Sequence, residues 1–184
     1  MATAREPEAG LFFVGVLAAD NEAASIARDA LAKRWGEPEI DGGPWPFSIH
    51  TRYYEAEAGP AMVRRFFAFP GDFPPGALAD RKTETNALEI ELAKRIGGAW
   101  PRPVNLDSGY VAADKVVLAS AKNHQHRIYI GRGIYAEATL FWQGGGFVSL
   151  PWTFPDFASG LYDDFFRAAR ERLLARRRSY SAVS

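Results

Sequence analysis

The chain contains no cysteine in its 184 residues. This absence excludes disulfides, thiolate metal sites, iron–sulfur clusters and cysteine nucleophiles. The chain also lacks a long apolar run, and its first residues, MATAREPEAG, have no apolar signal-peptide core. We therefore expect a cytoplasmic protein that has no membrane partner.

An excess of charge of either sign is missing as well. The 22 Lys and Arg residues balance the 22 Asp and Glu residues, so the formal net charge is +0 at pH 7. Bulk electrostatics gives no reason to expect a nucleic-acid or membrane partner, although a local cluster of cations could still bind phosphate. The hydrophobic fraction of 47% is that of an ordinary globular protein.

The length fits one domain over residues 1–184, with residues 1–10 flexible, a core over 11–106 and an extension over 107–184. The core elements predicted from periodicity and turn residues are, in order, a strand at Leu11–Ala18, a helix capped by Asp20 and ended by Gly36, the loop GGPWPF, strands at Phe47–Tyr54 and Met62–Phe69, a helix from about Ala77 to Ile96, and a strand at Arg102–Leu106. This order is that of a ferredoxin-like α+β sandwich.

The extension is predicted to hold a short helix, a C-terminal β-hairpin and a final helix. Its elements are a helix at Ala112–Ala121, strands at Arg127–Ile130 and Ile134–Trp142, a GGG turn, a strand at Phe147–Leu150, and a helix from Leu161. The strand Ile134–Trp142 alternates strictly, which predicts Ile134, Ala136, Ala138, Leu140 and Trp142 on one face and Tyr135, Glu137, Thr139 and Phe141 on the other.

Two glycine motifs in the extension look like nucleotide fingerprints. Gly131–Ala136 fits G-x-G-x-x-A, but that motif works between a strand and a helix, whereas a strand is predicted to follow here. A hairpin turn therefore explains the glycines better. No G-x-x-x-x-G-K-[ST] sequence occurs, so a P-loop is absent.

Residues 105–156 hold nearly every residue type that could do chemistry. Asn105 and Asp107 are two apart at a predicted strand end, and Lys115 and Lys122 fall on one face of the predicted helix 112–121 with Ala119 between them. With Arg127 these cations could bind phosphate, which makes the phosphate-binding candidates Asn105, Lys115, Lys122 and Arg127. The alternative is a capped helix whose lysines are solvated.

The histidines of this segment offer two further kinds of chemistry. His124 and His126, together with Asp107 or Glu137, could ligate zinc or manganese. General acid–base catalysis by His126, Asp107 or Glu137 is the other hypothesis, because histidine titrates near neutral pH. The structural alternatives are a histidine that satisfies backbone groups and a Glu137 that faces solvent or pairs with Arg127, Lys115 or Lys122.

Two patterns elsewhere are interpreted structurally. Lys82, Asn86 and Glu89 repeat at helical spacing and predict a solvated polar stripe on the long helix. The segment PWTFPDF at Pro151–Phe157 predicts a rigid aromatic plug or a cleft wall.

The chain resembles a prokaryotic family, the domain-of-unknown-function family four-four-one-six. The matching segments are LFFVGVLAAD, FSIHTRYYEAEAG, KTETNALE, VNLDSGYVAADKVVLASAKNHQHRIYIGRGIYAEATL and LPWTFPDF. The family shows D-P-G-Y where this chain has Asp107-Ser108-Gly109-Tyr110. Its members often carry the label GTP-binding protein, but residues 121–124, AKNH, are not the N-K-x-D element of GTPases.

The sequence leaves three functional hypotheses open. The leading one is binding of a phosphate-bearing ligand, a nucleotide or an RNA end, without a P-loop. The second is a structural or protein-interaction module without a small-molecule site, whose exposed aromatics Tyr53, Tyr54 and Trp152 mark the interface. The third is a metal-dependent hydrolase. No particular cofactor or oligomeric state is indicated.

Overall fold

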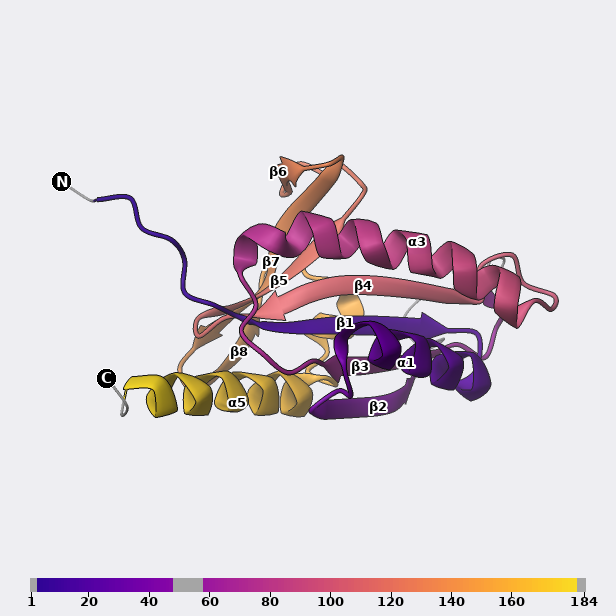
Figure 1. Cartoon of the computed structure of the whole chain (residues 1–184), viewed down its shortest axis with the longest axis horizontal. Coiled ribbons are helices and arrows are strands. Elements are labelled where there is room, and N and C mark those ends of the chain that lie inside the picture. Colours follow the sequence, from indigo (N-terminus) through magenta and orange to yellow (C-terminus); the bar gives the residue numbers. More distant parts are fainter. Residues whose placement is uncertain (1–2, 48–57, 182–184) are drawn as a thin grey trace.

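The computed structural model describes residues 3–47 and 58–181 of the chain (Figure 1). It is an α+β protein, as predicted. The elements are β1 (Leu11–Ala18), α1 (Asn21–Trp35), β2 (Ile40–Pro46), β3 (Val63–Ala68), the 3₁₀ helix η1 (Pro75–Ala77), α3 (Leu78–Ile96), β4 (Val104–Val111), β5 (Lys115–Ser120), β6 (Ile128–Gly131), β7 (Ile134–Gln143), β8 (Gly146–Ser149), α4 (Pro155–Ala158) and α5 (Asp163–Ser181).

The strands form one eight-stranded sheet in the order β2-β3-β1-β4-β5-β7-β6, and β8 also pairs with β7. Every pairing between the strands is antiparallel. The sheet therefore runs on from β4 into β5, β7 and β6, instead of ending where the predicted core ends. In the described ranges, no helix is long and apolar enough to cross a membrane.

The two largest hydrophobic cores lie on the two faces of the sheet, and β1 contributes to both because all of its residues are buried. A smaller cluster consists of Leu17, Phe47, Ala58 and Met62. Phe12, Val14 and Val16 pack with α1 and α3, while Leu11 and Phe13 pack with α5. We call these the α3 face and the α5 face (Figure 1). Alternation along each strand assigns every side chain to one of the two faces.

The first helix begins and ends as the sequence predicts. The Asp20 carboxylate accepts a hydrogen bond from the amide of Ala23 at 2.8 Å, which satisfies one of the free amides of the first turn. Gly36 follows the last residue with φ 88°, a conformation that other residues rarely adopt. The predicted hairpin turn at Gly131–Gly133 is also confirmed, since it joins β6 to β7.

Two predictions of element type are wrong. Residues 115–120, expected in a helix, form β5, because the run VVLA pairs with β4 and β7 and is covered on both faces. Lys115 and Lys122 therefore share no helical face. The GGPWPF segment, expected as a loop, contributes Gly42–Pro46 to β2, an edge strand with a register shift where prolines are tolerated. Most of the predicted strand Phe47–Tyr54 lies outside the described residues.

The strict alternation predicted for β7 is wrong beyond Ala138. Val116 pairs with Leu140 and Val117 with Ala138, so Thr139 is an extra residue that reverses the alternation. Ile134 and Ala136 lie on the α3 face, but Leu140 and Trp142 pack on the α5 face. The strand consequently covers both cores, and Glu137 points to the α5 face with Tyr135.

The strand β4 is longer than predicted, and it pairs with β5 over only part of its length. β4 runs on through Ser108, Gly109 and Tyr110, so Asp107 lies inside a strand and not at its end. β4 pairs with β1 along its whole length but with β5 only at Gly109, Tyr110 and Val111. The two strands diverge before Ser108, and this divergence positions the polar residues described below.

A test of this divergence point is Gly109→Ala. An added Cβ would lie 2.5 Å from the carbonyl oxygen of Val117 and 2.6 Å from Cζ of Phe13. We expect the free energy of unfolding, measured in urea, to fall by about 1–3 kcal/mol, because neither the strand nor the buried ring can move freely. The matched control is Gly76→Ala, where an added Cβ meets nothing within 4 Å. Equal stability of the two variants would contradict the close packing.

Candidate functional site

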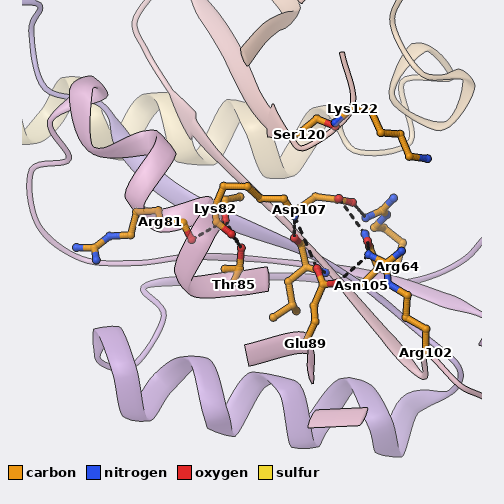
Figure 2. Close-up of polar contacts among 12 residues, drawn as sticks. Arg64, Arg81, Lys82, Thr85, Glu89, Arg102, Asn105, Asp107, Ser120 and Lys122 are labelled. Carbon is orange, nitrogen blue, oxygen red and sulfur yellow. Dashed lines mark hydrogen bonds and ion pairs between the residues drawn. The ribbon is translucent and has the colours of Figure 1, made fainter. Parts of the chain in front are cut away.

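The site residues predicted from the sequence fall into two polar clusters. The β4 cluster consists of Arg64, Lys82, Glu89, Arg102, Asn105, Asp107 and Asp156. The β7 cluster consists of Ser120, Lys122, His124, His126, Arg127, Glu137 and Trp152. Figure 2 shows Ser120 and Lys122 lying apart from the residues grouped around Asp107.

The β4 cluster begins at the strand edge that β5 leaves open. The amide of Leu106 donates to Glu89 Oε1 at 2.8 Å, and Nζ of Lys82 donates to the Leu106 carbonyl at 2.6 Å (Figure 2). Buried backbone groups need such partners. Lys82 and Glu89 are buried and lie 3.7 Å apart, so the predicted solvated stripe on α3 is wrong at these two positions.

Arg64 connects the strand edge to α4. Its Nη1 donates to Asp107 Oδ2 at 2.7 Å, and its Nη2 lies 3.6 Å from Asp156 Oδ2. Only 5% of Arg64 is exposed. Burial opposes its charge, but the two carboxylates outweigh burial and raise the pKa of the guanidinium above its ordinary value. Nε of Arg64 is buried and has no hydrogen-bond partner within the described part of the chain.

Asp107 is ionised in this setting. Burial alone would raise its pKa, but the charges of Arg64 and Lys82 and the hydrogen bonds from Arg64 and Asn105 hold the pKa below its usual value. Asn105 donates to Asp107 Oδ1 at 2.8 Å, and Arg102 bonds to both Asn105 and Glu89. The β4 cluster is thus an ion network of three cations and three carboxylates.

The β7 cluster is organised by a single buried carboxylate. Glu137 Oε2 accepts a hydrogen bond from Arg127 Nε at 2.6 Å and lies 2.9 Å from Nε2 of His126. Nη1 of Arg127 also donates to Ser120 Oγ at 2.8 Å and to the Lys122 carbonyl at 3.0 Å. Arg127 thereby ties the segment after β5 to β7. Its pairing with Glu137 is one of the alternatives that the sequence offers.

Aromatic rings line the solvent side of this cluster. The His126 ring lies parallel to that of His124, with centroids 5.9 Å apart and an interplanar angle of 5°, and to Trp152, at 5.6 Å and 9°. The Trp152 indole is fixed by a hydrogen bond from Nε1 to the carbonyl of Ala138 at 2.9 Å. His124 and Trp152 are exposed. Trp152, which belongs to the segment predicted as an aromatic plug or cleft wall, therefore lies at the surface.

The structure separates residues that the sequence grouped together. Lys122, His126, Arg127 and Glu137 lie together, whereas Asn105 and Asp107 belong to the β4 cluster. Lys115 pairs with Asp114 at 2.9 Å and lies at the opposite end of β5 from Ser120, about 16 Å away along an extended strand.

Metal binding by His124 and His126 gains no support from these contacts. His126 reaches one carboxylate, that of Glu137. Within residues 3–47 and 58–181, no group of three or more His, Asp or Glu side chains is arranged to hold a metal ion.

Sequence reasoning missed the cations of the β4 cluster. Arg64 stands in the apolar run MVRRFFAF, where Arg64, Phe66 and Ala68 occupy one face of a buried strand. A charged residue at a core position of a strand indicates a buried partner. That signal identifies Arg64 but does not name Asp107 or Asp156 as its partners.

Asp107 predicts a specific pH dependence. Its pKa is lower in the folded protein than in the unfolded chain, so its ionised form stabilises the fold fully above about pH 4 and loses this effect as the pH falls through the folded value. We expect Asp107→Asn to lower the free energy of unfolding at pH 7 by roughly 1.5–3 kcal/mol. The difference should shrink at pH 3, as measured by urea unfolding. Asp29→Asn, at an exposed position, is the control; a pH-independent loss would contradict the assignment.

Glu137 predicts a large loss of stability. Glu137→Gln removes the charge that compensates Arg127, whose side chain is only 4% exposed. Leaving a buried guanidinium unpaired costs about 3–5 kcal/mol, which thermal and urea unfolding would detect. Glu91→Gln, at an exposed position on α3, should change stability by less than about 0.5 kcal/mol. A small effect of Glu137→Gln would show that the β7 cluster is not held by this carboxylate.

Comparison with known proteins identifies a family. Residues 8–173 match the family model of a domain of unknown function (DUF4416). No curated protein and no solved structure shows significant similarity to the chain.

Proposed function

The chain belongs to the DUF4416 family, a domain of unknown function, and we propose that it binds a phosphate-bearing ligand at the β7 cluster. The ligand is a nucleotide or an RNA end, and the site uses no P-loop. The observation that carries the proposal is the set of parallel rings of His124, His126 and Trp152, in a segment that also holds Lys122.

Parallel rings that are partly open to solvent suit a nucleobase, and here His124 and Trp152 are exposed while His126 is half-buried. Bases are held on proteins by stacking on aromatic or histidine rings, and each stacked base contributes about 1–3 kcal/mol. Trp152 is anchored by its indole hydrogen bond, and the ring of His126 is held by Glu137. A rigid ring loses little conformational freedom when a ligand binds, so this surface is prepared for stacking.

The local charge supports phosphate binding although the whole chain is neutral. Between Lys115 and Phe154 the sequence contains two lysines and two arginines but only one carboxylate, Glu137. That carboxylate is buried against Arg127. The other charged side chains of this segment are cations, of which Arg132 pairs with Asp80 of α3.

The residues of the cluster have different roles in this proposal. Lys122, which is exposed, contacts phosphate, while Arg127 and Glu137 position the segment around His126. In the tautomer whose Nε2 donates to Glu137, Nδ1 of His126 is left as an acceptor for a group of the ligand. Asn105, Asp107 and Lys115 lie outside this surface and take no part.

We further infer that β1–β4 with α1 and α3 are a ferredoxin-like unit. In support, these four strands follow the order β2-β3-β1-β4 with antiparallel neighbours, and both helices pack on one face. Strands β5–β8 and α5 then extend the unit and complete the α5 face. The β7 cluster belongs to this extension.

A protein-interaction module is the second candidate, because one observation favours it. β6 is an edge strand of the sheet, and Ile128 on it is 73% exposed. Exposed apolar edge strands tend to pair with another chain. On this alternative, Ile128→Ala weakens association with a partner while nucleotides and RNA fail to bind.

The test is titration calorimetry with inorganic phosphate, GTP, ATP and a short RNA. We expect saturable binding of at least one nucleotide or RNA that weakens as salt increases, because phosphate contacts release counterions. Lys122→Ala should lower the affinity about fivefold to tenfold, which corresponds to about 1–1.4 kcal/mol. Trp152→Ala should lower the affinity for base-bearing ligands but not for phosphate.

Lys115→Ala is the matched control, because it removes a cation from the start of β5, whereas Lys122 follows the end of that strand. Its affinity should stay within about twofold of the wild type. Absence of binding by the wild type to every nucleotide and RNA tested would refute the proposal. Equal losses in Lys115→Ala and Lys122→Ala would show nonspecific attraction instead of a site.

A further inference from the structure

The rings of the β7 cluster continue along the β6–β7 hairpin. Tyr129 and Tyr135 pair across the two strands, with ring centroids 5.4 Å apart at 61°. Residues that pair directly across strands have side chains on the same face. Tyr135 is also two residues from Glu137 on β7, so the tyrosine pair and the Glu137–His126 pair share the α5 face.

This row of rings is most open to solvent at its two ends, while His126 and Tyr135 between them are half-buried. Tyr129 is 59% exposed and Trp152 is 39% exposed. The hairpin lies beyond α3 at the top of Figure 1, away from α5, which covers the same face only further down the sheet. Successive same-face positions on a strand are about 7 Å apart, so the surface from Trp152 to Tyr129 is longer than one base.

Two cations lie near the hairpin part of the row. Lys122 follows the end of β5, where Ser120 pairs with Tyr135, and Arg132 occupies the hairpin turn. Arg132 is exposed and pairs with Asp80 of α3, a surface ion pair that a phosphate can replace at little cost. A single nucleotide needs one ring and one cation, whereas this arrangement offers several rings and two cations.

We propose that the ligand of this site is a single-stranded nucleic acid whose bases stack along the row formed by Trp152, His126, Tyr135 and Tyr129. The inference rests on the proposed function, because it extends the same site along the hairpin. Aromatic side chains on an open sheet surface bind unpaired bases, and cations beside them bind the backbone. A duplex, whose bases are already stacked and paired, cannot use these rings.

The exposed Ile128 of β6 does not belong to this surface. Ile128 pairs with Ala136, which packs on the α3 face, so Ile128 lies on the side of the hairpin opposite to Tyr129. In this proposal, nucleic acid contacts the face that carries Tyr129, whereas an apolar protein partner would contact the opposite face, which carries Ile128. Tyr129→Ala and Ile128→Ala are a matched pair, since both positions are exposed and adjacent.

The experiment is fluorescence anisotropy with labelled RNA and DNA oligonucleotides of increasing length, an RNA duplex and a labelled mononucleotide. We expect affinity to rise over the first few nucleotides and then to level off, with the duplex binding at least about tenfold more weakly. Tyr129→Ala should weaken binding of the oligonucleotides about fivefold to fiftyfold, as expected for one lost stacking contact. Tyr129→Phe should retain binding, because the ring remains.

Mononucleotide binding separates this inference from the proposed function. Tyr129→Ala should leave mononucleotide affinity within about twofold of the wild type, whereas Trp152→Ala should weaken both ligands. If mononucleotides bind but longer strands bind no better, the inference is overturned and the proposed function stands. If neither binds, both fail. A loss in Ile128→Ala as large as in Tyr129→Ala, or duplex binding equal to single-strand binding, also overturns the inference.

Discussion

The backbone of β4 has to be satisfied where β5 leaves it, and much of the polar structure follows from that constraint. A buried amide and carbonyl at Leu106 have no strand partner on the open side, and leaving them unpaired would cost roughly the energy of desolvating each group. Lys82 and Glu89 of α3 supply the missing partners. Lys82 and Glu89 are therefore buried between α3 and β4, although their spacing in the sequence predicts a solvated stripe.

Once two charges are buried, their neighbours must balance them. Glu89 also accepts a hydrogen bond from Arg102, which bonds to Asn105, and Asn105 donates to Asp107. Asp107 in turn holds Arg64. The network contains as many carboxylates as cations, so it has no net positive charge that would attract an anion. Its hydrogen bonds instead stabilise the place where β4 and β5 separate.

The β7 cluster has the opposite balance. Its one carboxylate, Glu137, is buried, pairs with Arg127 and lies against His126. On the proposed function, a chain with no net charge would bind an anion through the local cations of this cluster. Bulk neutrality excludes electrostatic attraction over the whole molecule, but it says little about one surface that is a few strands wide.

Local patterns determined much of the fold. The run Leu11–Ala18, the Asp20 cap and the helix ended by Gly97 are specified by neighbouring residues, because hydrophobic periodicity and capping act within a few positions. The hairpin turn at Gly131–Gly133 was predictable for the same reason. The sequence also indicated that His126, Arg127 and Glu137 belong to the segment where chemistry concentrates.

Tertiary structure alone decided where those side chains meet. Residues 115–120 suit a helix or a buried strand, and only pairing with β4 and β7 selects the strand. The extra residue Thr139 reverses the faces of β7, an effect that no periodicity reveals. Arg64 and Asp107 are 43 positions apart, and ion pairing at such a separation depends on the strand order of the sheet. The sequence by itself therefore determined most of the helices and strands and identified the side chains that could bind a ligand or transfer a proton. Only the sheet decided which of these side chains lie together, because contacts between distant residues are fixed by long-range packing.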